Sequence, residues 1–239
     1  MCYNREKLFK FFIFAFLAVA ICCQVQATLL VDISANSGTP LQSGYLEFYA
    51  GAEQTSPKSF NYSSDLGLNG TLTVGISGNT HYRDYPAIIS SNPYYSMTNL
   101  LSDNALRNVD GTMVLTLSNL IDGTYSITTY HHDTSTAGIF DLRLTDANMT
   151  NQTLFSNVSV EEGTNPSKLN TLTFNFEVED NSSVMIYMQR KVGSSGGNHL
   201  ALNGFNLDIE TPAVPEPTTL ILFLGCIGFF SIIRRKDRR

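Results

Sequence analysis

Two adjacent histidines followed by an aspartate, His131-His132-Asp133, stand out as side chains that could do chemistry. Imidazole and carboxylate groups serve as metal ligands and as acid–base groups. Neighbouring residues on a strand point to opposite faces, so both histidines reach one metal ion only where the strand has ended. Residues 125–130 are expected to form a strand and the Ser/Thr residues after Asp133 a loop. The cluster is therefore predicted to lie at a rim of the fold.

Three interpretations of this cluster stay open. It is a metal site if folding brings in a third ligand such as His199, a surface that contacts sugars, or a structural or solvated loop. We predict no metal centre, because nothing in the spacing itself places His199 beside the other two histidines.

A second polar group, Tyr82-Arg83-Asp84, is expected to form a polar loop. Arg and Asp can bind sugar hydroxyls through directed hydrogen bonds, and Tyr can stack on a sugar ring. The same Arg–Asp pair can equally be an internal ion pair that fixes the loop. Tyr94 and Tyr95 either form an exposed aromatic surface on which a sugar ring stacks or belong to the core. The absence of Trp from the chain disfavours the sugar-stacking surface. The predicted ligand rim consists of Tyr82, Arg83, Asp84, His131, His132, Asp133 and His199.

Carboxylates near the two ends of the folded body suggest one further site. Asp32, Asp208 and Glu210 could hold a structural Ca²⁺ through their oxygens if the ends of the domain meet. No Asp-rich loop with calcium spacing is present, so we predict no cofactor and keep calcium as the alternative. The chain also has no Gly-x-Ser-x-Gly elbow, His-Glu-x-x-His motif or phosphate loop, and we predict that it is not an enzyme.

The elements that must position these residues are mostly strands. Apolar and polar residues alternate along 172–178, which is typical of a strand with one buried and one solvated face. Only residues 94–108 show helical spacing, with Met97, Leu100, Leu101 and Ala105 on one face. Strands are predicted over 29–33, 44–50, 70–76, 113–117, 125–129, 138–144, 153–160, 172–178, 184–188 and 205–209.

This pattern predicts an all-β fold, a β-sandwich of the jelly-roll type, over residues 28–210. Immunoglobulin topology is the alternative, although its Cys and Trp hallmarks are absent. Residues 28–214 contain seven Lys or Arg and eighteen Asp or Glu, a net charge of −11, which disfavours nucleic acid as a partner. All four cysteines lie outside this body, so it can form no disulfide and no thiolate metal site.

The N-terminus has the layout of a secretory signal. Arg5, Lys7 and Lys10 precede an apolar run over 11–23, and small or modest residues lead to Ala27. We predict a signal peptide over 1–27 that signal peptidase cleaves after Ala27, with an uncleaved membrane anchor as the alternative.

The C-terminus combines an apolar run with a basic end. Residues 218–233 carry no Asp, Glu, Lys, Arg or His, and as a helix they would be about 24 Å long, short for a bilayer core of about 30 Å unless Arg234 and Arg235 extend to the interface. We predict a linker over 211–217, a transmembrane helix over 218–233 and a cytoplasmic basic tail over 234–239. The body would then lie outside the cytoplasm. The alternative, a buried core helix, would need a polar face that this run lacks.

Pro215-Glu216-Pro217, followed by this apolar span and basic end, resembles the PEP-CTERM sorting signal of exported proteins from bacteria that make exopolysaccharide. The resemblance implies an exosortase as partner, a membrane enzyme that cleaves near the motif, so the tail would be a removable address. The body resembles the galactose-binding-like β-sandwiches on residues 81–84, on 120–133 and on Leu202-Asn203-Gly204-Phe205.

Together these features predict an exported protein of the cell surface or the exopolysaccharide matrix of a biofilm, with a non-enzymatic β-sandwich that binds carbohydrate. A structural or adhesive matrix protein without a small ligand is the alternative. A polysaccharide-active enzyme is the third interpretation.

Overall fold

The computed structural model describes residues 28–34, 40–49, 58–63, 71–77, 81–84, 88–107, 111–133, 138–191 and 199–209. All of them belong to one compact unit, Gln26–Glu210. The predicted cleavage site at Ala27, the Pro215-Glu216-Pro217 motif, the apolar span over 218–233 and the basic tail lie outside the described residues. Within the described ranges, no helix has the length and apolar character needed to cross a bilayer.

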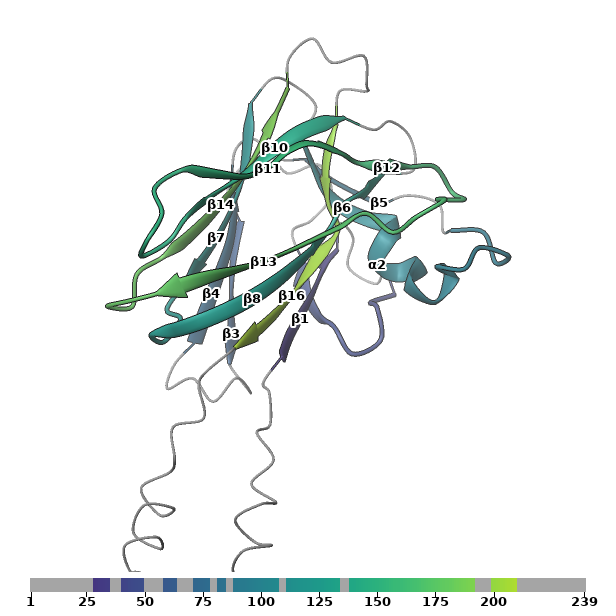
Figure 1. Ribbon diagram of the computed structural model, residues 1–239. Helices are drawn as coiled ribbons and strands as arrows, with labels where there is room; N and C mark the ends of the chain where they lie inside the picture. Colours follow the sequence, from purple (N-terminus) through teal and green to yellow (C-terminus); the bar gives the residue numbers. More distant parts are fainter. Residues whose placement is uncertain are drawn as a thin grey trace, which may run out of the picture. The chain divides into compact units, whose positions relative to one another are not determined.

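Two large β-sheets dominate the body (Figure 1). Neighbouring strands are antiparallel within both sheets, except for β1 and β2, which run parallel. The five-stranded sheet has the order β13 (Thr171–Val178), β8 (Gly123–Tyr130), β16 (Gly204–Ile209), β1 (Thr28–Ser34) and β2 (Leu46–Tyr49). The six-stranded sheet has the order β11 (Gln152–Ser159), β10 (Ile139–Thr145), β14 (Val184–Arg190), β7 (Thr112–Ser118), β4 (Thr71–Ser77) and β3 (Lys58–Ser63). The predicted all-β sandwich is confirmed, and its jelly-roll type stays a prediction.

The core forms because side chains alternate between the two faces of each strand. In β7, Met113, Leu115 and Leu117 are fully buried, while the residues between them are half-exposed. β10 and β14 show the same alternation, and the inward-facing apolar side chains of both sheets make one continuous cluster. Burying each such aliphatic side chain contributes about 1.5–3 kcal/mol.

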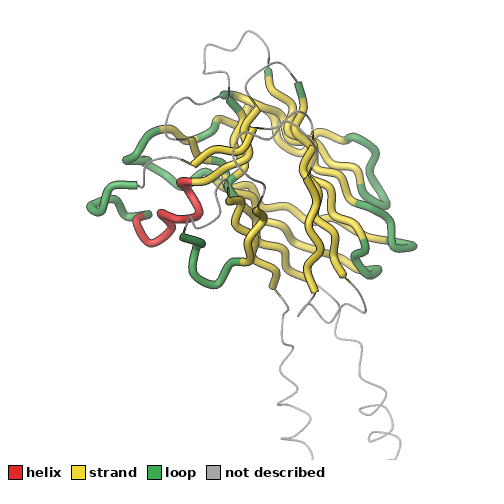
Figure 2. The backbone as a smooth tube through the Cα atoms, turned by 180° about the vertical axis from the view of Figure 1, so that it is seen from behind, coloured by secondary structure: helices red, strands yellow, loops and turns green. Residues whose placement is uncertain are grey.

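Smaller elements gather at one end of the sandwich. A three-stranded sheet has the order β15 (Leu200–Leu202), β6 (Asp103–Arg107) and β5 (His81–Asp84). A two-stranded parallel pair joins β9 (His132–Asp133) to β12 (Glu161–Glu162). The 3-10 helix η1 (Tyr95–Met97) and the α-helix α2 (Thr98–Ser102) complete this end, and Figure 2 shows them in red from behind.

Two predictions about this end were wrong. The helix predicted over 94–108 ends at Ser102, because residues 103–107 are strand β6, which pairs with β5 on one side and β15 on the other. Residues 82–84, predicted as a loop, belong to β5. Both errors have one cause: the backbone hydrogen bonds of these short segments come from strands that are distant in the sequence, and no local pattern reports them.

Candidate functional site

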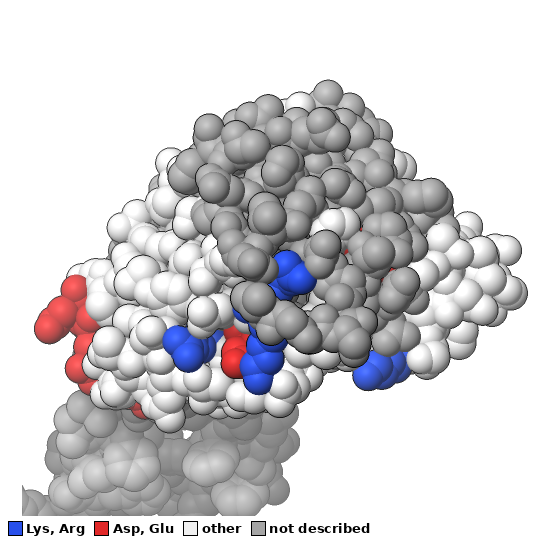
Figure 3. Space-filling view, turned by 90° about the horizontal axis from the view of Figure 1, so that it is seen from above, with Lys and Arg blue, Asp and Glu red and all other residues white. Residues whose placement is uncertain are grey.

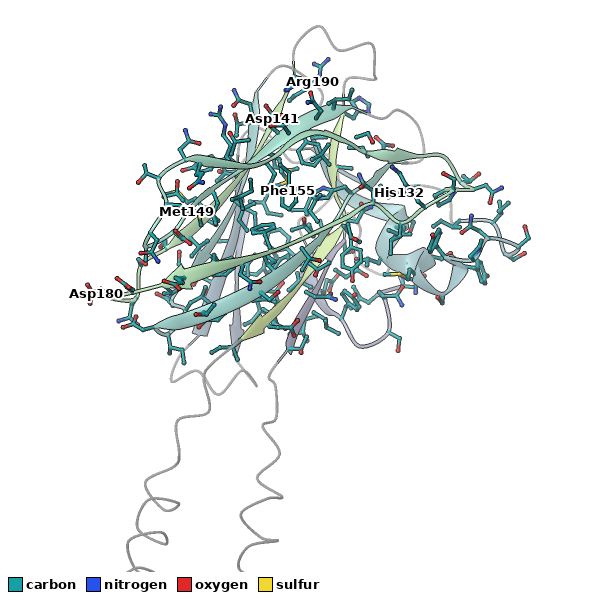
Figure 4. The ribbon with its side chains drawn as sticks, in the orientation of Figure 1. His132, Asp141, Met149, Phe155, Asp180 and Arg190 are labelled. Carbon is teal, nitrogen blue, oxygen red and sulfur yellow. The ribbon has the colours of Figure 1, made fainter. Side chains whose placement is uncertain are left out.

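The three separated groups of predicted rim residues become neighbours at this end. β5, with residues 82–84, lies in the same sheet as β15, and His199 directly precedes β15. The β9 strand that holds His132 and Asp133 contacts β15 and α2. Figure 4 places His132 at the end of the body opposite to Met149 and Asp180. The side chains of Tyr82, Arg83 and Asp84 lie outside the described part of the structure.

His131 is fully buried, and both of its ring nitrogens are hydrogen-bonded. Its Nδ1 lies 2.7 Å from the carbonyl oxygen of Ala201, which can only accept, so Nδ1 carries the proton. Its Nε2 then accepts from the Thr129 hydroxyl at 2.8 Å. Burial lowers the pKa of His131 to about 4, so the ring is neutral at physiological pH. A neutral ring with both nitrogens occupied has no lone pair left for a metal ion, and His131 is a structural residue.

The other members of the cluster are also part of a buried framework. His132 is 2 % exposed and Asp133 is fully buried. The Asp133 carboxylate lies 3.3 Å from Nδ1 of His199, whose side chain is 17 % exposed and thus nearest to solvent among the three histidines. Among the described residues, no group of three or more His, Cys, Asp or Glu could hold a metal ion.

Asn203 connects this framework to the rest of the body. Its carbonyl oxygen accepts from the Ile33 amide of β1, and its own amide donates to Tyr130 of β8. Its side-chain Oδ1 accepts from the amide of His132 at 2.6 Å, and its Nδ2 donates to the Leu101 carbonyl of α2 at 3.3 Å. One fully buried side chain therefore fixes α2 and β9 relative to the five-stranded sheet.

Gly204, the next residue, marks a close approach of three elements. A Cβ atom at this position would lie 2.3 Å from the Val31 carbonyl oxygen and 2.6 Å from Cδ1 of Leu100. No side chain fits in that space, so glycine is required for β16 to pack against β1 and α2.

Residues 88–97, which we call the tyrosine loop, form part of the exposed surface of this end. Ile89 is 41 % exposed and Tyr95 49 %, Pro93 is also exposed, and Tyr94 is half-buried. The loop contains no Asp, Glu, Lys, Arg or His. It protrudes beside α2 at the right of Figure 1, and in Figure 3 the same end shows mainly uncharged residues (white), with a Lys or Arg side chain (blue) beside them.

Asn92 holds the tyrosine loop in place from beneath. This side chain is 5 % exposed, and its Nδ2 donates to Oδ1 of Asn165 at 2.7 Å and to the Pro166 carbonyl at 3.0 Å. Its Oδ1 accepts from the amide of Tyr94 at 2.8 Å. The exposed apolar groups are therefore presented on a loop whose conformation is already fixed. The turn-forming Asn-Pro before two adjacent tyrosines is the sequence signal for such a loop, and sequence reasoning left those tyrosines undecided between platform and core.

The carboxylates considered for calcium do not all meet. β1 and β16 are antiparallel neighbours, with Asp32 opposite Gly204 and Asp208 opposite Thr28. Four residues of strand separate the two positions, about 13 Å, which is too far for one ion. Glu210 lies outside the described residues.

Comparisons with known proteins add structural similarity at low identity. No family model matches the chain, and no curated protein matches it. The extracellular domain of ANXUR2 from Arabidopsis thaliana aligns at 10 % identity, covering 77 % of this chain and 49 % of that one, with a TM-score of 0.47. The CBM22-1 xylan-binding domain from Paenibacillus barcinonensis aligns at 15 % identity, covering 69 % of this chain and 99 % of that one, with a TM-score of 0.33. A family 35 carbohydrate-binding module from Clostridium thermocellum aligns at 10 % identity, covering 65 % of this chain and 99 % of that one, with a TM-score of 0.34. These TM-scores are too low to carry an argument about what this chain binds.

Proposed function

We propose that this chain is an exported, non-enzymatic protein of the bacterial cell surface or exopolysaccharide matrix, and that its β-sandwich binds neutral polysaccharide through the tyrosine loop. The observation that carries the binding proposal is Tyr95, half-exposed on an uncharged loop that buried Asn92 fixes. Export and sorting rest on the two end patterns of the sequence, with signal peptidase acting after Ala27 and an exosortase recognising Pro215-Glu216-Pro217.

The chemistry of the tyrosine loop favours a sugar ring over other partners. An aromatic ring stacks on the apolar face of a sugar, and the Tyr hydroxyl supplies a hydrogen bond at its edge. Because Asn92 already fixes the loop, little conformational entropy is lost on binding. The net charge of −11 over residues 28–214 repels acidic polysaccharides, which leaves neutral ones as the preferred class.

The binding proposal is tested with the full chain against neutral and acidic polysaccharides. Tyr95→Ala should weaken binding to a neutral polysaccharide about five- to thirtyfold, because one stacking contact contributes about 1–2 kcal/mol. Tyr49→Ala is the matched control, since Tyr49 is 38 % exposed but lies on edge strand β2. Equal affinity of the Tyr95 variant and the wild type would overturn the proposal. Absence of binding to every polysaccharide would favour a structural matrix protein instead.

The sorting proposal is tested separately in cells. Removing residues 214–239 should release the body from the cell envelope, because the predicted span and the exosortase motif are both lost. Equal retention of the truncated and full-length chains at the envelope would contradict it.

A further inference from the structure

Asp32 is a carboxylic acid buried on the outer side of β1. The residue is 1 % exposed, and its Oδ2 accepts from the amide of Gln42 at 2.7 Å. Its Oδ1 is buried too, and no hydrogen-bond partner for it exists among the described residues. A carboxylate in such a place is poorly solvated, since one of its two oxygens is buried and accepts from no described donor.

Gln42 belongs to residues 40–45, which we call the strap, and its side chain reaches the tyrosine loop. Gln42 Nε2 donates to the Ser96 carbonyl at 3.0 Å, and its Oε1 accepts from the Leu100 amide at 3.5 Å. A second contact runs the other way, from Nδ2 of Asn99 to the Leu41 carbonyl at 2.9 Å. The strap thus connects Asp32 to Ser96 within η1, next to Tyr95, and to the first turn of α2.

Among the described side chains, the groups around Asp32 do not compensate its charge. Glu47 lies opposite Asp32 on β2, and Tyr45 lies on the strap. β16 contributes Gly204, opposite Asp32 in register, and no ionisable side chain at that position. The pKa of Asp32 is raised from 3.8 to about 7: burial is the largest cause, the Gln42 hydrogen bond opposes the rise, and the Glu47 charge adds to it. β5 and β6 also pack on β1, and their ionisable residues have side chains outside the described part of the structure: His81, Tyr82, Arg83, Asp84, Asp103 and Arg107.

We propose that Asp32 is a proton switch for the tyrosine loop. In its protonated form the strap stays closed on β1 and holds the loop. When the carboxyl loses its proton, the strap opens to let water reach the carboxylate, and the tyrosine loop loses its support from Gln42. The weaker glycan binding that follows from this rests on the proposed function.

The size of the effect follows from a thermodynamic cycle. Opening exposes the carboxyl to water and returns its pKa toward the ordinary value of 3.8. A difference of about three pKa units corresponds to a shift of the opening equilibrium by up to about 1,000-fold between acidic and alkaline pH. This net difference already includes the opposing effect of the Gln42 hydrogen bond, which is stronger to a carboxylate than to a neutral acid.

Hydrogen exchange of the full chain tests the switch without any ligand. After correction for the intrinsic exchange rate, protection of the Gln42 and Leu100 amides should fall about tenfold or more from about pH 5 to about pH 9. Amides of β7 should show no such change. Asp32→Asn keeps an acceptor for the Gln42 amide and cannot ionise, so its strap should be insensitive to pH. Asp208→Asn, on the neighbouring strand, is the matched control and should behave as the wild type.

Two results would overturn the switch: strap protection that does not depend on pH in the wild type, or pH dependence that persists in Asp32→Asn. Glu47→Gln provides a second variant if Asp32→Asn does not fold. Removing that like charge should lower the pKa of Asp32 and move the midpoint of strap opening to lower pH. An unchanged midpoint would contradict the role of Asp32.

Binding of a neutral polysaccharide at several pH values separates the switch from the proposed function. Affinity should fall as the strap opens, and affinity independent of pH would refute the coupling to the tyrosine loop. If no polysaccharide binds at any pH while the exchange result holds, the proposed function is refuted and the switch is supported.

Discussion

Replacing Asn203 with alanine should reveal how much the buried framework contributes to stability. The change removes the acceptor for the His132 amide and the donor to the Leu101 carbonyl, both at a fully buried position. Leaving a buried polar group without its partner costs about 1–3 kcal/mol, and two groups are affected. We expect a loss of about 2–4 kcal/mol in the free energy of unfolding. For a domain of this size, Tm should fall by about 5–12 °C.

Urea denaturation of the full chain, followed by far-UV circular dichroism, measures this loss. Asn175→Ala is the control, because Asn175 is exposed on edge strand β13, and it should change the free energy of unfolding by less than about 0.5 kcal/mol. An Asn203 variant as stable as this control would refute the view that one side chain fixes α2 and β9 to the sheet.

Further outcomes follow from the same structure. Gly204→Ala should cost about 3 kcal/mol or more in urea denaturation, because its Cβ would overlap the Val31 carbonyl and Leu100; normal stability would show that β16 can shift. The raised pKa of Asp32 makes the stability of the wild type fall as pH rises from 3.8 to about 7. Asp32→Asn removes this loss, so it should stabilise the protein by up to about 4 kcal/mol at about pH 8 and have little effect near pH 4. In the wild type, the lowered pKa of His131 makes stability fall as pH drops from 6.5 to about 4, and His131→Gln should lose this fall. Thermal unfolding at several pH values tests both variants. A variant whose Tm changes with pH in the same way as that of the wild type would contradict its prediction. Tyr95→Ala should leave Tm unchanged while weakening polysaccharide binding, and a large drop in Tm would show that Tyr95 is a packing residue.

The two buried titrating groups act against each other over nearly the same pH range. Ionisation of Asp32 removes stability as pH rises, whereas loss of the proton from unfolded His131 adds stability. The wild type should therefore show a nearly flat stability between about pH 4 and about pH 7, although each group alone contributes several kcal/mol.

The long strands could be predicted from the sequence because their pattern is local. In 171–178, apolar and polar side chains alternate, and the structure buries alternate residues of this strand and of β14. The short strands β5 and β6 were missed for the opposite reason. They form only because distant segments supply their hydrogen-bond partners, and Leu100 and Leu101 gave the following residues a helical spacing that the sheet overrides.

The location of the candidate site was easier to predict than its surface. The end of β8 at Tyr130 could be inferred from the alternation, which placed His131 and its neighbours after a strand. Their burial depends on contacts of β9 with β12, β15 and α2. The sequence pattern predicts neither of these two strands, and it gives the helix different bounds. Tyr95 and His131 have similar amphipathic side chains, and only the tertiary fold decides that the first faces solvent and the second does not.

The pairing of β1 with β16 has a consequence for the order of folding. The first and last strands of the described body are direct neighbours, and the contact between Thr28 and Asp208 spans 180 positions of the chain. β16 also lies between β8 and β1, so without it the five-stranded sheet is two separate pairs. The sandwich therefore closes only when its final strand arrives, and such distant pairing makes closure slow. Until then β1 and β8 each present an unpaired strand edge. A chaperone that shields these edges would therefore raise the yield of folded protein more than one that binds the turns.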